Sequence, residues 1–324
     1  MQAVVYEHFG TPDALQLREV AVPEPKDDEV LVRVRAASVN SWDWDKLVGK
    51  PAMLRWMSFG TPQHPILGAD VAGTVEAVGS SVTRLRPGDH VFGDISGCHW
   101  GGFAEYVCAR AEVLAIKAPE MSFEQASALP QAGVLALQGL RFGGEFQPGQ
   151  HILFNGAGGG VGTLGIQIAK SYGAEVTGVD SAGKLEMLRS LGADHVVDYQ
   201  QEDFTRSGQQ YDLIVDVIGN KSVSDYRRAL TPAGTYAMIG GRGTTVAEVF
   251  LKGFLTWTGR QRIGLVMHKP NIADLDRLTS LFVDGKLVPV IDTVYPLRQV
   301  QEGLRRIGAG DVKGKIIITM EDTP

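Results

Sequence analysis

The chain has 324 residues, of which 44% are hydrophobic and 21% are charged, and its formal net charge is −6 at neutral pH. This is an ordinary globular composition for about two domains. The acidic balance excludes a general basic surface for nucleic acid or anionic membrane, and no apolar run approaches the ~18 residues that cross a bilayer. Cys98 and Cys108 are the only cysteines, and the N-terminus shows no signal-peptide pattern. We therefore expect a reducing, cytoplasmic location.

The first 120 residues are rich in short β-branched or alternating runs, such as "QAVVYE", "EVLVRVRAASV" and "DVAGTVEAVG". Proline, glycine and aspartate separate these runs. The pattern predicts a compact β domain whose strands are mostly antiparallel.

The pattern changes near residue 121. Ser122 and Gln125 have the spacing of a capping box at the start of a helix. From "QHILFNGA" to "GTYAMIGG", buried apolar strands alternate with helical segments, which is typical of a parallel, doubly wound α/β sheet. Residues 246–262 fit either a helix or a mobile cover.

The C-terminal part is predicted to contain two helices and a final strand, "KGKIIITM". We expect this strand to return to the first domain. The predicted domains are therefore residues 1–120 plus 265–324, and residues 121–264.

The stretch "NGAGGGVG" joins a predicted strand to a predicted helix. Small residues at such a turn let the backbone approach a pyrophosphate, and the helix N-terminus offers N–H groups and partial positive charge. Ala157 replaces the first glycine of GxGxxG, so the motif alone is weak. Asp180, however, ends the next strand, where a carboxylate accepts ribose hydroxyls. We predict a dinucleotide site; the alternative for Asp180 is a helix N-cap.

Asp180 also favours NADH over NADPH. A 2′-phosphate beside this carboxylate would meet a repulsion of about 4 kcal/mol per unit charge at ~4 Å in a partly screened site. Lys184 and Arg189 are close enough in sequence to offset it. We predict a modest preference for NADH.

The chain carries eight motifs in order over nearly its whole length: "AASVNSWDW", "HPILGADVAGTVEAVG", "RPGDHVFG", "GGFAEYV", "GAGGGVG", "RSLGADHVVDY", "YDLIVDVIG" and "KGKIIIT". In these it resembles the medium-chain dehydrogenase/reductase superfamily, and within it the zinc-independent quinone oxidoreductase branch. The resemblance implies a GroES-like catalytic domain interrupted by a Rossmann domain, with the active site in the cleft between them. It also implies a homodimer, whose surface we expect at a sheet edge around "GTYAMIGG" and "RIGLVMH".

Zinc-dependent members of the superfamily carry metal ligands at positions where this chain has Asn40, Ala69 and Gln131. Two amides and a methyl group cannot form a tetrahedral Cys/His site. The cysteine-rich lobe that binds structural zinc is also missing, and the adjacent Cys98 and His99 cannot close a site by themselves. We predict no bound metal.

Without zinc, reduction of a quinone or of an activated C=C bond needs hydride from a nicotinamide and a hydrogen-bond donor for the developing oxyanion. Asn40 is our candidate donor; the alternative is that its side chain satisfies backbone groups at a strand end. Asp43, at a helix start, is expected to be a cap or a cofactor-orienting group. Trp42 and Trp44 lie where the family often has a tyrosine.

The resemblance extends the cofactor site to the nicotinamide pocket, to the adenine and to the loops after two later strands. Tyr199 is the candidate beside the adenine, and the alternative is that it only packs against the protein. The complete predicted cofactor set is Gln131, Val134, Ala157, Gly158, Gly159, Gly160, Val161, Gly162, Asp180, Lys184, Tyr199, Val217, Ile218, Gly219, Ile239, Gly240 and Gly241. Flat aromatic walls suit quinones and conjugated carbonyls, and the predicted substrate pocket comprises Trp42, Trp44, Trp56, Phe59, Trp100 and Trp257, several of which fit a core position equally well.

The sequence therefore predicts a zinc-independent, NAD(P)H-dependent oxidoreductase that transfers hydride to a quinone or an α,β-unsaturated carbonyl compound. A zinc-free alcohol or aldehyde oxidoreductase is one alternative, although we find no base for it near Asn40. A non-catalytic dinucleotide-binding redox sensor is another. We expect a small-molecule substrate, and neither nucleic acid nor membrane as a partner.

Overall fold

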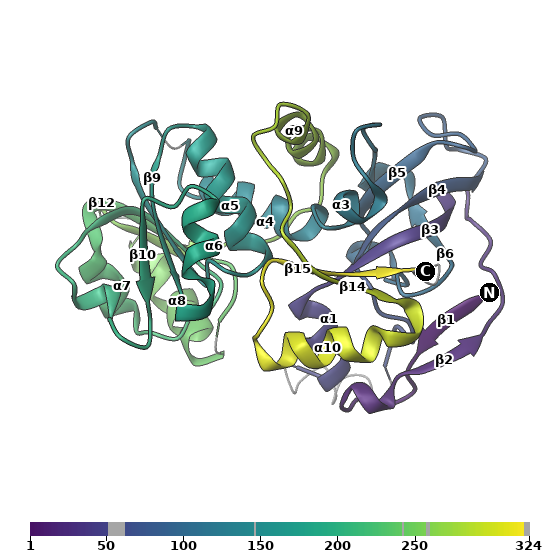
Figure 1. Ribbon diagram of the computed structural model, residues 1–324, viewed down its shortest axis with the longest axis horizontal. Coiled ribbons are helices and arrows are strands. Elements are labelled where there is room, and N and C mark those ends of the chain that lie inside the picture. The colour runs from purple at the N-terminus through teal and green to yellow at the C-terminus, as the bar shows by residue number, and fades with distance from the viewer. Residues whose placement is uncertain (51–61, 146, 242, 257–259, 321–324) are drawn as a thin grey trace. The chain divides into compact units, whose positions relative to one another are not determined.

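The computed structural model describes residues 1–50, 62–145, 147–241, 243–256 and 260–320, with the backbone alone for 252–256. The chain forms two compact units (Figure 1). Their ranges are Met1–Gln131, Pro270–Val283 and Ile291–Pro324 for the first unit, and Ala132–Lys269 and Asp284–Val290 for the second. No helix among the described residues is long and apolar enough to cross a membrane.

The predicted domain boundaries at residues 120 and 264 differ from the division into units. Helix α3 (Phe123–Ser127) had been assigned to the second domain, but it packs on strands β3 and β4 of the first. Phe123 and Ala128 join Ala36 in a small core there. The predicted capping box is present: the Gln125 N–H donates to Ser122 Oγ at 3.1 Å, and the Ser122 N–H donates to Gln125 Oε1 at 2.9 Å.

A seven-stranded sheet forms the centre of the first unit, and its strand pairs are antiparallel except for β14–β15. The final strand pairs with β3, so the predicted return to the first domain is confirmed. The order is β14 (Ile291–Pro296), β15 (Lys315–Thr319), β3 (Glu29–Val39), β4 (Asp70–Val78), β5 (His90–Asp94) and β7 (Leu114–Ile116), with β6 (Tyr106–Arg110) also on β3; β1 (Gln2–Val5) and β2 (Gln16–Glu19) form a separate pair.

Helices cover this sheet, and its core is formed by aliphatic side chains from alternating strand positions. Trp44 of α1 lies against α10, where a Cβ on Gly308 would come within 2.4 Å of the indole ring. The elements are α1 (Ser41–Val48), α9 (Ile272–Val283), α10 (Val300–Ala309), and the 3-10 turns Pro12–Ala14, Ser96–Cys98, Ala111–Val113 and Leu297–Gln299.

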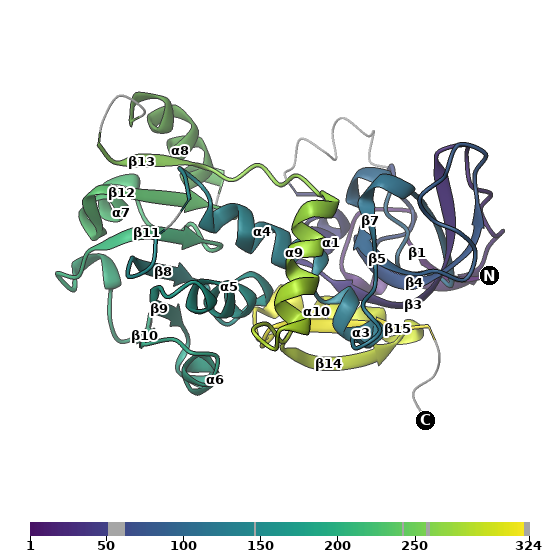
Figure 2. The same ribbon diagram turned by 90° about the horizontal axis from the view of Figure 1, so that it is seen from above.

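The second unit is built on a six-stranded sheet in which every pair is parallel, as predicted for a Rossmann domain (Figure 2). The order is β10 (His195–Asp198), β9 (Glu175–Asp180), β8 (His151–Asn155), β11 (Tyr211–Asp216), β12 (Leu230–Met238) and β13 (Arg262–Leu265). Its helices are α4 (Pro130–Leu140), α5 (Gly160–Ser171), α6 (Leu185–Ser190), α7 (Val223–Ala229) and α8 (Gly243–Thr256), with 3-10 turns at Ala182–Lys184 and Phe204–Arg206.

Helices lie on both faces of this sheet because neighbouring strand residues point in opposite directions. Leu153 packs in a core with Tyr226 of α7 and Val249 of α8. The next residue, Phe154, faces α5, where a Cβ on Gly165 would come within 2.4 Å of its ring. In the described part of residues 246–262, α8 runs to Thr256 and β13 begins at Arg262, and these two elements lie side by side in Figure 2.

Strand β13 ends the sheet order, whereas β12 lies between β11 and β13. The prediction that "GTYAMIGG" lies at a sheet edge is therefore wrong. Residues 262–265 satisfy the backbone groups of β12 on that side, and only "RIGLVMH" remains at the edge.

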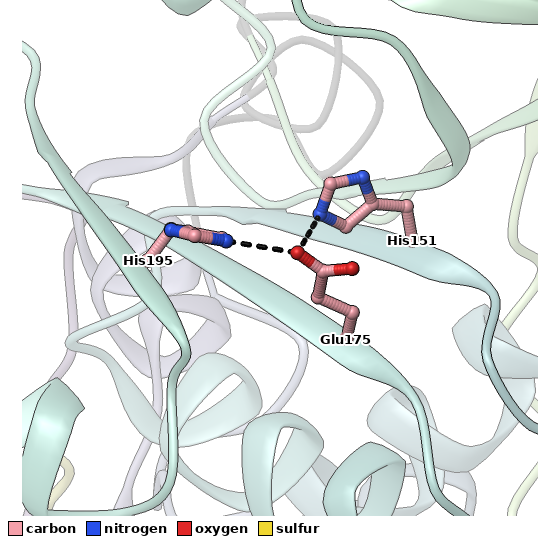
Figure 3. Close-up of side chains that lie close together, drawn as sticks. All are labelled: His151, Glu175 and His195. Carbon is pink, nitrogen blue, oxygen red and sulfur yellow. Dashed lines mark hydrogen bonds and ion pairs between the residues drawn. The ribbon is translucent and has the colours of Figure 1, made fainter.

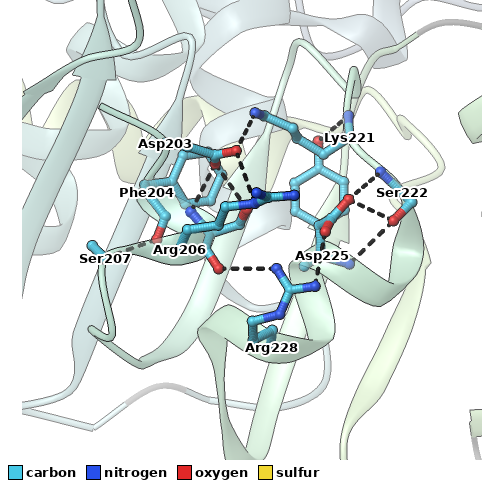
Figure 4. A network of polar contacts seen from close by, with 10 residues as sticks. Asp203, Phe204, Arg206, Ser207, Lys221, Ser222, Asp225 and Arg228 are labelled. Atoms are coloured by element: carbon cyan, nitrogen blue, oxygen red, sulfur yellow. Dashed lines mark hydrogen bonds and ion pairs between the residues drawn. The ribbon is translucent and has the colours of Figure 1, made fainter. Parts of the chain in front are cut away.

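A polar network fastens the turn at Phe204–Arg206 to the start of α7 (Figure 4). Lys221 Nζ lies 2.7 Å from Asp203 Oδ2, and Asp203 in turn caps the turn through the Thr205 N–H. Ser222 and Asp225 form a capping box at the start of α7. These contacts satisfy polar groups of a long connection outside the sheet, so we assign them a structural role.

We expect Gly162→Ala to lower the melting temperature of the protein. A Cβ at Gly162 would lie 2.4 Å from Ala157 Cα, a backbone atom, so helix α5 has to move away from the sheet. Overpacking of this kind costs about 1–3 kcal/mol. Gly183→Ala is the matched control, because a Cβ there meets nothing within 4 Å. Thermal unfolding that is equally affected by both changes would contradict this packing argument.

Candidate functional site

The glycine-rich turn lies at the carboxyl end of β8 and leads directly into α5. Gly156 has a positive φ of +83°, and a Cβ there would lie 2.4 Å from the Val217 side chain. Gly159 is the N-cap of α5. Because the first N–H groups of a helix have no partner within it, the turn presents donors and the positive end of the helix dipole together. This arrangement can bind an anionic group such as a pyrophosphate.

Asp180 ends β9 and closes the same turn. Its Oδ2 accepts the Gly158 N–H at 2.7 Å, and its Oδ1 accepts the Ser181 N–H at 2.8 Å. Lys184 Nζ lies 3.4 Å from Oδ1, and the two side chains are only 12% and 11% exposed. A Cβ on Gly158 would overlap the Lys184 stem at 2.4 Å. The N-cap positions that follow are Ser181 and Lys184, so the N-cap alternative for Asp180 does not hold.

Asp216 is a buried residue at the carboxyl edge of the sheet that the sequence reasoning missed. It ends β11, is fully buried, and accepts the Ile218 and Gly219 N–H groups at 2.9 Å each. Asn155 Nδ2 donates to it at 2.9 Å, and so does the Tyr236 hydroxyl. One carboxylate thus joins the ends of β8 and β11 and fixes the next loop. The available signal was an acid at the end of the apolar run "YDLIVD".

The two later loops of the predicted cofactor set meet each other. A Cβ on Gly219, whose φ is +50°, would lie 2.6 Å from Gly241 Cα. Ile218 is exposed at the same carboxyl edge. Tyr199 follows β10, and its side chain is 56% exposed, which argues against the packing alternative. The remaining members of the set in this unit are Ala157, buried, Gly160 and Val161 in the first turn of α5, Val217 after β11, and Ile239 and Gly240 after β12.

A second group of predicted residues lies in the first unit, around Asp70. This carboxyl group is fully buried at the start of β4. It accepts hydrogen bonds from Ser38 Oγ at 2.9 Å, Asn40 Nδ2 at 3.0 Å and the Gln131 N–H at 3.0 Å. Lys315 Nζ, from β15, lies 3.6 Å from Asp70 Oδ2 and 2.5 Å from Asn40 Oδ1. We name this set the Asp70 cluster.

Burial raises the pKa of Asp70, while the Lys315 ammonium group acts in the opposite direction. Burial likewise lowers the pKa of Lys315, which the neighbouring carboxylates oppose. No pattern in the sequence marks Lys315 as buried, because a lysine in "KGKIIIT" is expected to face solvent. It is instead 4% exposed.

Asn40 is 6% exposed, and both ends of its amide are engaged. The Nδ2 group donates to Asp70 and, at 3.5 Å, to the Ser38 carbonyl oxygen, while Oδ1 accepts from Lys315. These contacts favour the alternative that Asn40 satisfies polar groups at a strand end. Its role as a donor to substrate stays a prediction.

Asp43 is a buried capping residue at the start of α1. Its Oδ2 accepts the Asn40 N–H at 2.7 Å, and its Oδ1 accepts the Gly68 N–H at 2.8 Å. Burial raises the pKa of Asp43 to about 7, although the two backbone N–H groups lower it. The residue is fully buried, which fits the expected role as a helix cap, and its orienting role towards a cofactor stays a prediction.

Three other residues singled out from the sequence are buried in different ways. Ala69 is fully buried, and Gln131 is 3% exposed, with its Nε2 atom lacking a hydrogen-bond partner. Val134, in α4, is fully buried as well.

The predicted aromatic pocket is only partly described. Trp100 is 5% exposed and belongs to the core of the first unit, where Lys46 Nζ lies 4.7 Å from its ring. It also lines a cavity of about 610 Å³ within this unit, together with Cys98 and Tyr106. Trp44 is half-buried and packs against α10, which favours a core position, and Trp42 is 37% exposed; their place in the pocket stays a prediction. Trp56, Phe59 and Trp257 lie outside the described residues.

The comparisons with known proteins agree with this architecture. Residues 26–120 match the alcohol dehydrogenase GroES-like domain, and residues 191–318 match the family described as zinc-binding dehydrogenase. A chloroplastic quinone-oxidoreductase homolog from spinach is 35% identical over 98% of both chains. An NADPH-dependent alkenal/one oxidoreductase from Arabidopsis thaliana is 34% identical over 98% of this chain and 79% of its own length. The Escherichia coli quinone oxidoreductase in complex with NADPH superposes with a TM-score of 0.84 at 25% identity, covering 98% of this chain and 100% of its own.

A GroES-like unit together with a parallel Rossmann sheet defines a dehydrogenase/reductase of the medium-chain type, and the chain is an oxidoreductase of that class. Within this class it belongs to the quinone oxidoreductase-like branch of the medium-chain dehydrogenase/reductase superfamily.

The comparisons contradict the predicted cytoplasmic location. The spinach and Arabidopsis relatives are both described as chloroplastic. The prediction failed because two free cysteines distinguish a reducing compartment from an oxidising one, but not one reducing compartment from another.

We expect the stability that Asp43 contributes to decrease as pH rises. A carboxyl whose pKa is raised in the folded state contributes stability that is complete below its unfolded pKa of ~3.9 and is lost as pH rises through about 7. Asp43→Asn removes this titration and leaves Asp70 and Lys315 in place. Urea unfolding at pH 5 and pH 8 should show a larger gap between wild type and variant at pH 5. A gap that widens towards pH 8 would mean that the two backbone N–H groups outweigh burial.

Proposed function

We propose that the chain transfers hydride from NAD(P)H to a quinone or an α,β-unsaturated carbonyl compound without a zinc ion. The observation that carries this proposal is the turn at the start of α5, whose Gly158 N–H is held by Asp180 at the carboxyl edge of a parallel sheet. Pyrophosphate binding by helix N–H groups at this edge is the general mode of dinucleotide recognition in such sheets.

The residues of the second unit fit a nicotinamide dinucleotide. The first N–H groups of α5 suit the pyrophosphate, and Asp180 suits the adenosine ribose. The loops that contain Gly219 and Gly241 offer backbone groups at the same edge, in positions fixed by Asp216. When bound, the nicotinamide supplies the hydride.

The Asp70 cluster supports chemistry without zinc. Asn40 and Ala69 stand where zinc-dependent members of the superfamily carry zinc ligands. The Asn40 amide is hydrogen-bonded to Asp70 and Lys315, and Ala69 has no side-chain atom that could bind a metal. The Lys315 ammonium group already supplies a positive charge beside Asp70. A divalent cation at this place would have to displace or repel that charge. The family description that mentions zinc therefore does not fit these residues.

Two relatives are named for the reduction of quinones and of alkenals or alkenones. Both classes of acceptor take up hydride and develop negative charge on oxygen. A hydrogen-bond donor can stabilise this charge, and water can protonate the oxygen. We propose the same classes for this chain. Asn40 remains our candidate donor only if a substrate displaces one of its present contacts.

The preference between the two cofactors depends on the pair formed by Asp180 and Lys184. The charge argument for NADH named Lys184 and Arg189 as residues that could offset the carboxylate, and Lys184 Nζ lies 3.4 Å from Asp180 Oδ1. This ammonium group can turn to a 2′-phosphate, so the pair weakens the predicted preference for NADH. We propose that the chain accepts both cofactors.

The two alternative functions have less support. An alcohol oxidoreductase needs a base in contact with the substrate hydroxyl, and Asp43 and Asp70 are both completely buried. A dinucleotide sensor would share the glycine turn and differ only in the lack of turnover.

The homodimer implied by the resemblance stays a proposal, with β13 as the candidate edge. Apolar side chains gather on the elements there: Phe250 and Leu251 of α8 are 78% and 71% exposed, and Met267, after β13, is 67% exposed. Because α8 packs beside β13, a second copy pairing at this edge would cover side chains of both elements.

We expect turnover of NADH or NADPH with a quinone or an alkenone to persist in excess chelator. The reason is that the ammonium group of Lys315 already supplies the positive charge in the Asp70 cluster. Absorbance of the reduced cofactor at saturating acceptor measures this. Turnover that chelator abolishes while the protein stays folded, as circular dichroism checks, would refute the zinc-free proposal. Tight cofactor binding without turnover on either acceptor class would favour the sensor, and oxidation of alcohols alone would favour the other alternative.

We expect Lys184→Ala to lower kcat/KM for NADPH by about tenfold, the effect of losing ~1.4 kcal/mol of a charge-assisted contact. The value for NADH should change less than about twofold. Lys170→Ala is the control, since Lys170 forms an ion pair with Asp194 near the opposite end of α5. Equal losses for both cofactors would show that Lys184 acts by holding Asp180 and the turn, not by binding the 2′-phosphate.

A further inference from the structure

Two histidines and a glutamate come together at the amino-terminal edge of the Rossmann sheet. His151, Glu175 and His195 are the first residues of β8, β9 and β10, three strands that lie side by side. His151 is the register partner of Glu175, and His195 is the partner of Thr177, two residues further along β9. Residues two apart on a strand share a face, so all three side chains project from the same face of the sheet.

Both imidazole rings converge on one carboxylate oxygen (Figure 3). Glu175 Oε1 lies 2.9 Å from His151 Nε2 and 2.8 Å from His195 Nε2. The ligand atoms of the three residues all lie within 4.8 Å of one another, and no other such group of His, Cys, Asp or Glu occurs in the described part of the chain. The His151 Nε2 atom is buried, and its direction towards Oε1 is not that of a hydrogen bond.

This arrangement suits a metal ion better than it suits protons. Only His195 Nε2 is hydrogen-bonded to Glu175 Oε1, and His151 Nε2 has no hydrogen-bond partner among the described residues, whereas a cation between the three atoms would use a lone pair from each. Two imidazoles and a carboxylate are ligands of Zn²⁺, with a fourth position for water. Bonds of ~2.0–2.1 Å in tetrahedral geometry place ligand atoms about 3.3 Å apart. The two contacts to Glu175 Oε1, at 2.9 and 2.8 Å, would need to lengthen by roughly half an ångström.

The surroundings allow this adjustment. The side chains of Glu175 and His195 are 46% and 58% exposed, so they can rotate, while His151 is 24% exposed and lies beside the Tyr211 ring at 5.5 Å. The cluster thus has one fixed ligand and two adjustable ones. It is open to solvent, which gives an ion an entry path.

We propose that His151, Glu175 and His195 form a site for a divalent transition metal, with Zn²⁺ as the best fit. The site would fasten the first residues of three strands to one another. It lies at the edge of the sheet opposite to the glycine turn, and it does not rest on the proposed function. The interiors of the strands separate a bound ion at this edge from the carboxyl edge, so the ion would not touch a ligand bound there. We expect it to act on the stability of the Rossmann unit instead.

The test is calorimetric titration of the metal-free whole chain with ZnCl₂, followed by thermal unfolding with and without Zn²⁺. We expect one equivalent to bind and to raise the melting temperature, since a ligand that binds the folded state stabilises it. His195→Ala and Glu175→Gln should each weaken binding at least about tenfold and abolish the thermal shift. Both residues are exposed, so these variants should fold, and circular dichroism checks this.

His8→Ala is the matched control, because His8 is also exposed and lies beside a carboxylate, that of Glu7, without a third ligand. It should bind Zn²⁺ as wild type does. Zinc binding that survives in His195→Ala and Glu175→Gln would come from elsewhere, such as the two cysteines, and would overturn the proposal. Absence of binding by the wild type would overturn it as well, leaving the three residues as an ordinary surface ion cluster.

Discussion

The parallel direction of all six strands in the Rossmann sheet is the constraint on which the site in this unit depends. Parallel strands bring every carboxyl end to one edge, so the glycine turn, Asp180 and Asp216 meet there although they are far apart in sequence. The same direction brings every amino end to the other edge, where His151, Glu175 and His195 meet. One topological choice therefore gives the unit two separate polar edges with different chemistry.

The Asp70 cluster shows how the first unit accommodates a buried carboxyl group. Asp70 is surrounded by Ser38, Asn40, the Gln131 N–H and Lys315. Removing any one partner would leave buried charge or an unmatched polar atom, which is costly, although the intact cluster need contribute little net stability. Lys315 comes from the last strand, β15. The ion pair with Asp70 can therefore form only after the C-terminal segment has paired with β3.

The sequence allowed the fold and the cofactor turn to be predicted because both have local signals. Alternating apolar strands and helices predicted the parallel sheet, and the distance from Gly159 to Asp180 predicted their convergence at one edge. The Asp70 cluster had no such signal, since Lys315 and Asp70 lie on strands far apart in the chain. Trp44 has no clear signal for a related reason: an aromatic residue at a helix start can pack against a ligand or against another helix, and the contact with Gly308 of α10 became visible only in the structure.

The length of β8 decides how the two edges of the Rossmann sheet can interact. At ~3.3 Å per residue, the strand from His151 to Asn155 separates its ends by about 13 Å. A positive charge at His151 is therefore farther from the glycine turn than the Debye length of ~8–10 Å. The solvent around the strand screens the electrostatic interaction between them. Residues 151, 153 and 155 share a face, so the remaining route between the edges is mechanical: His151, Leu153 and Asn155 point to one side, and Asn155 holds Asp216. Fastening the amino-terminal ends of β8 to β10 can thus stiffen the frame that positions Asp180 and Asp216 without touching the cofactor.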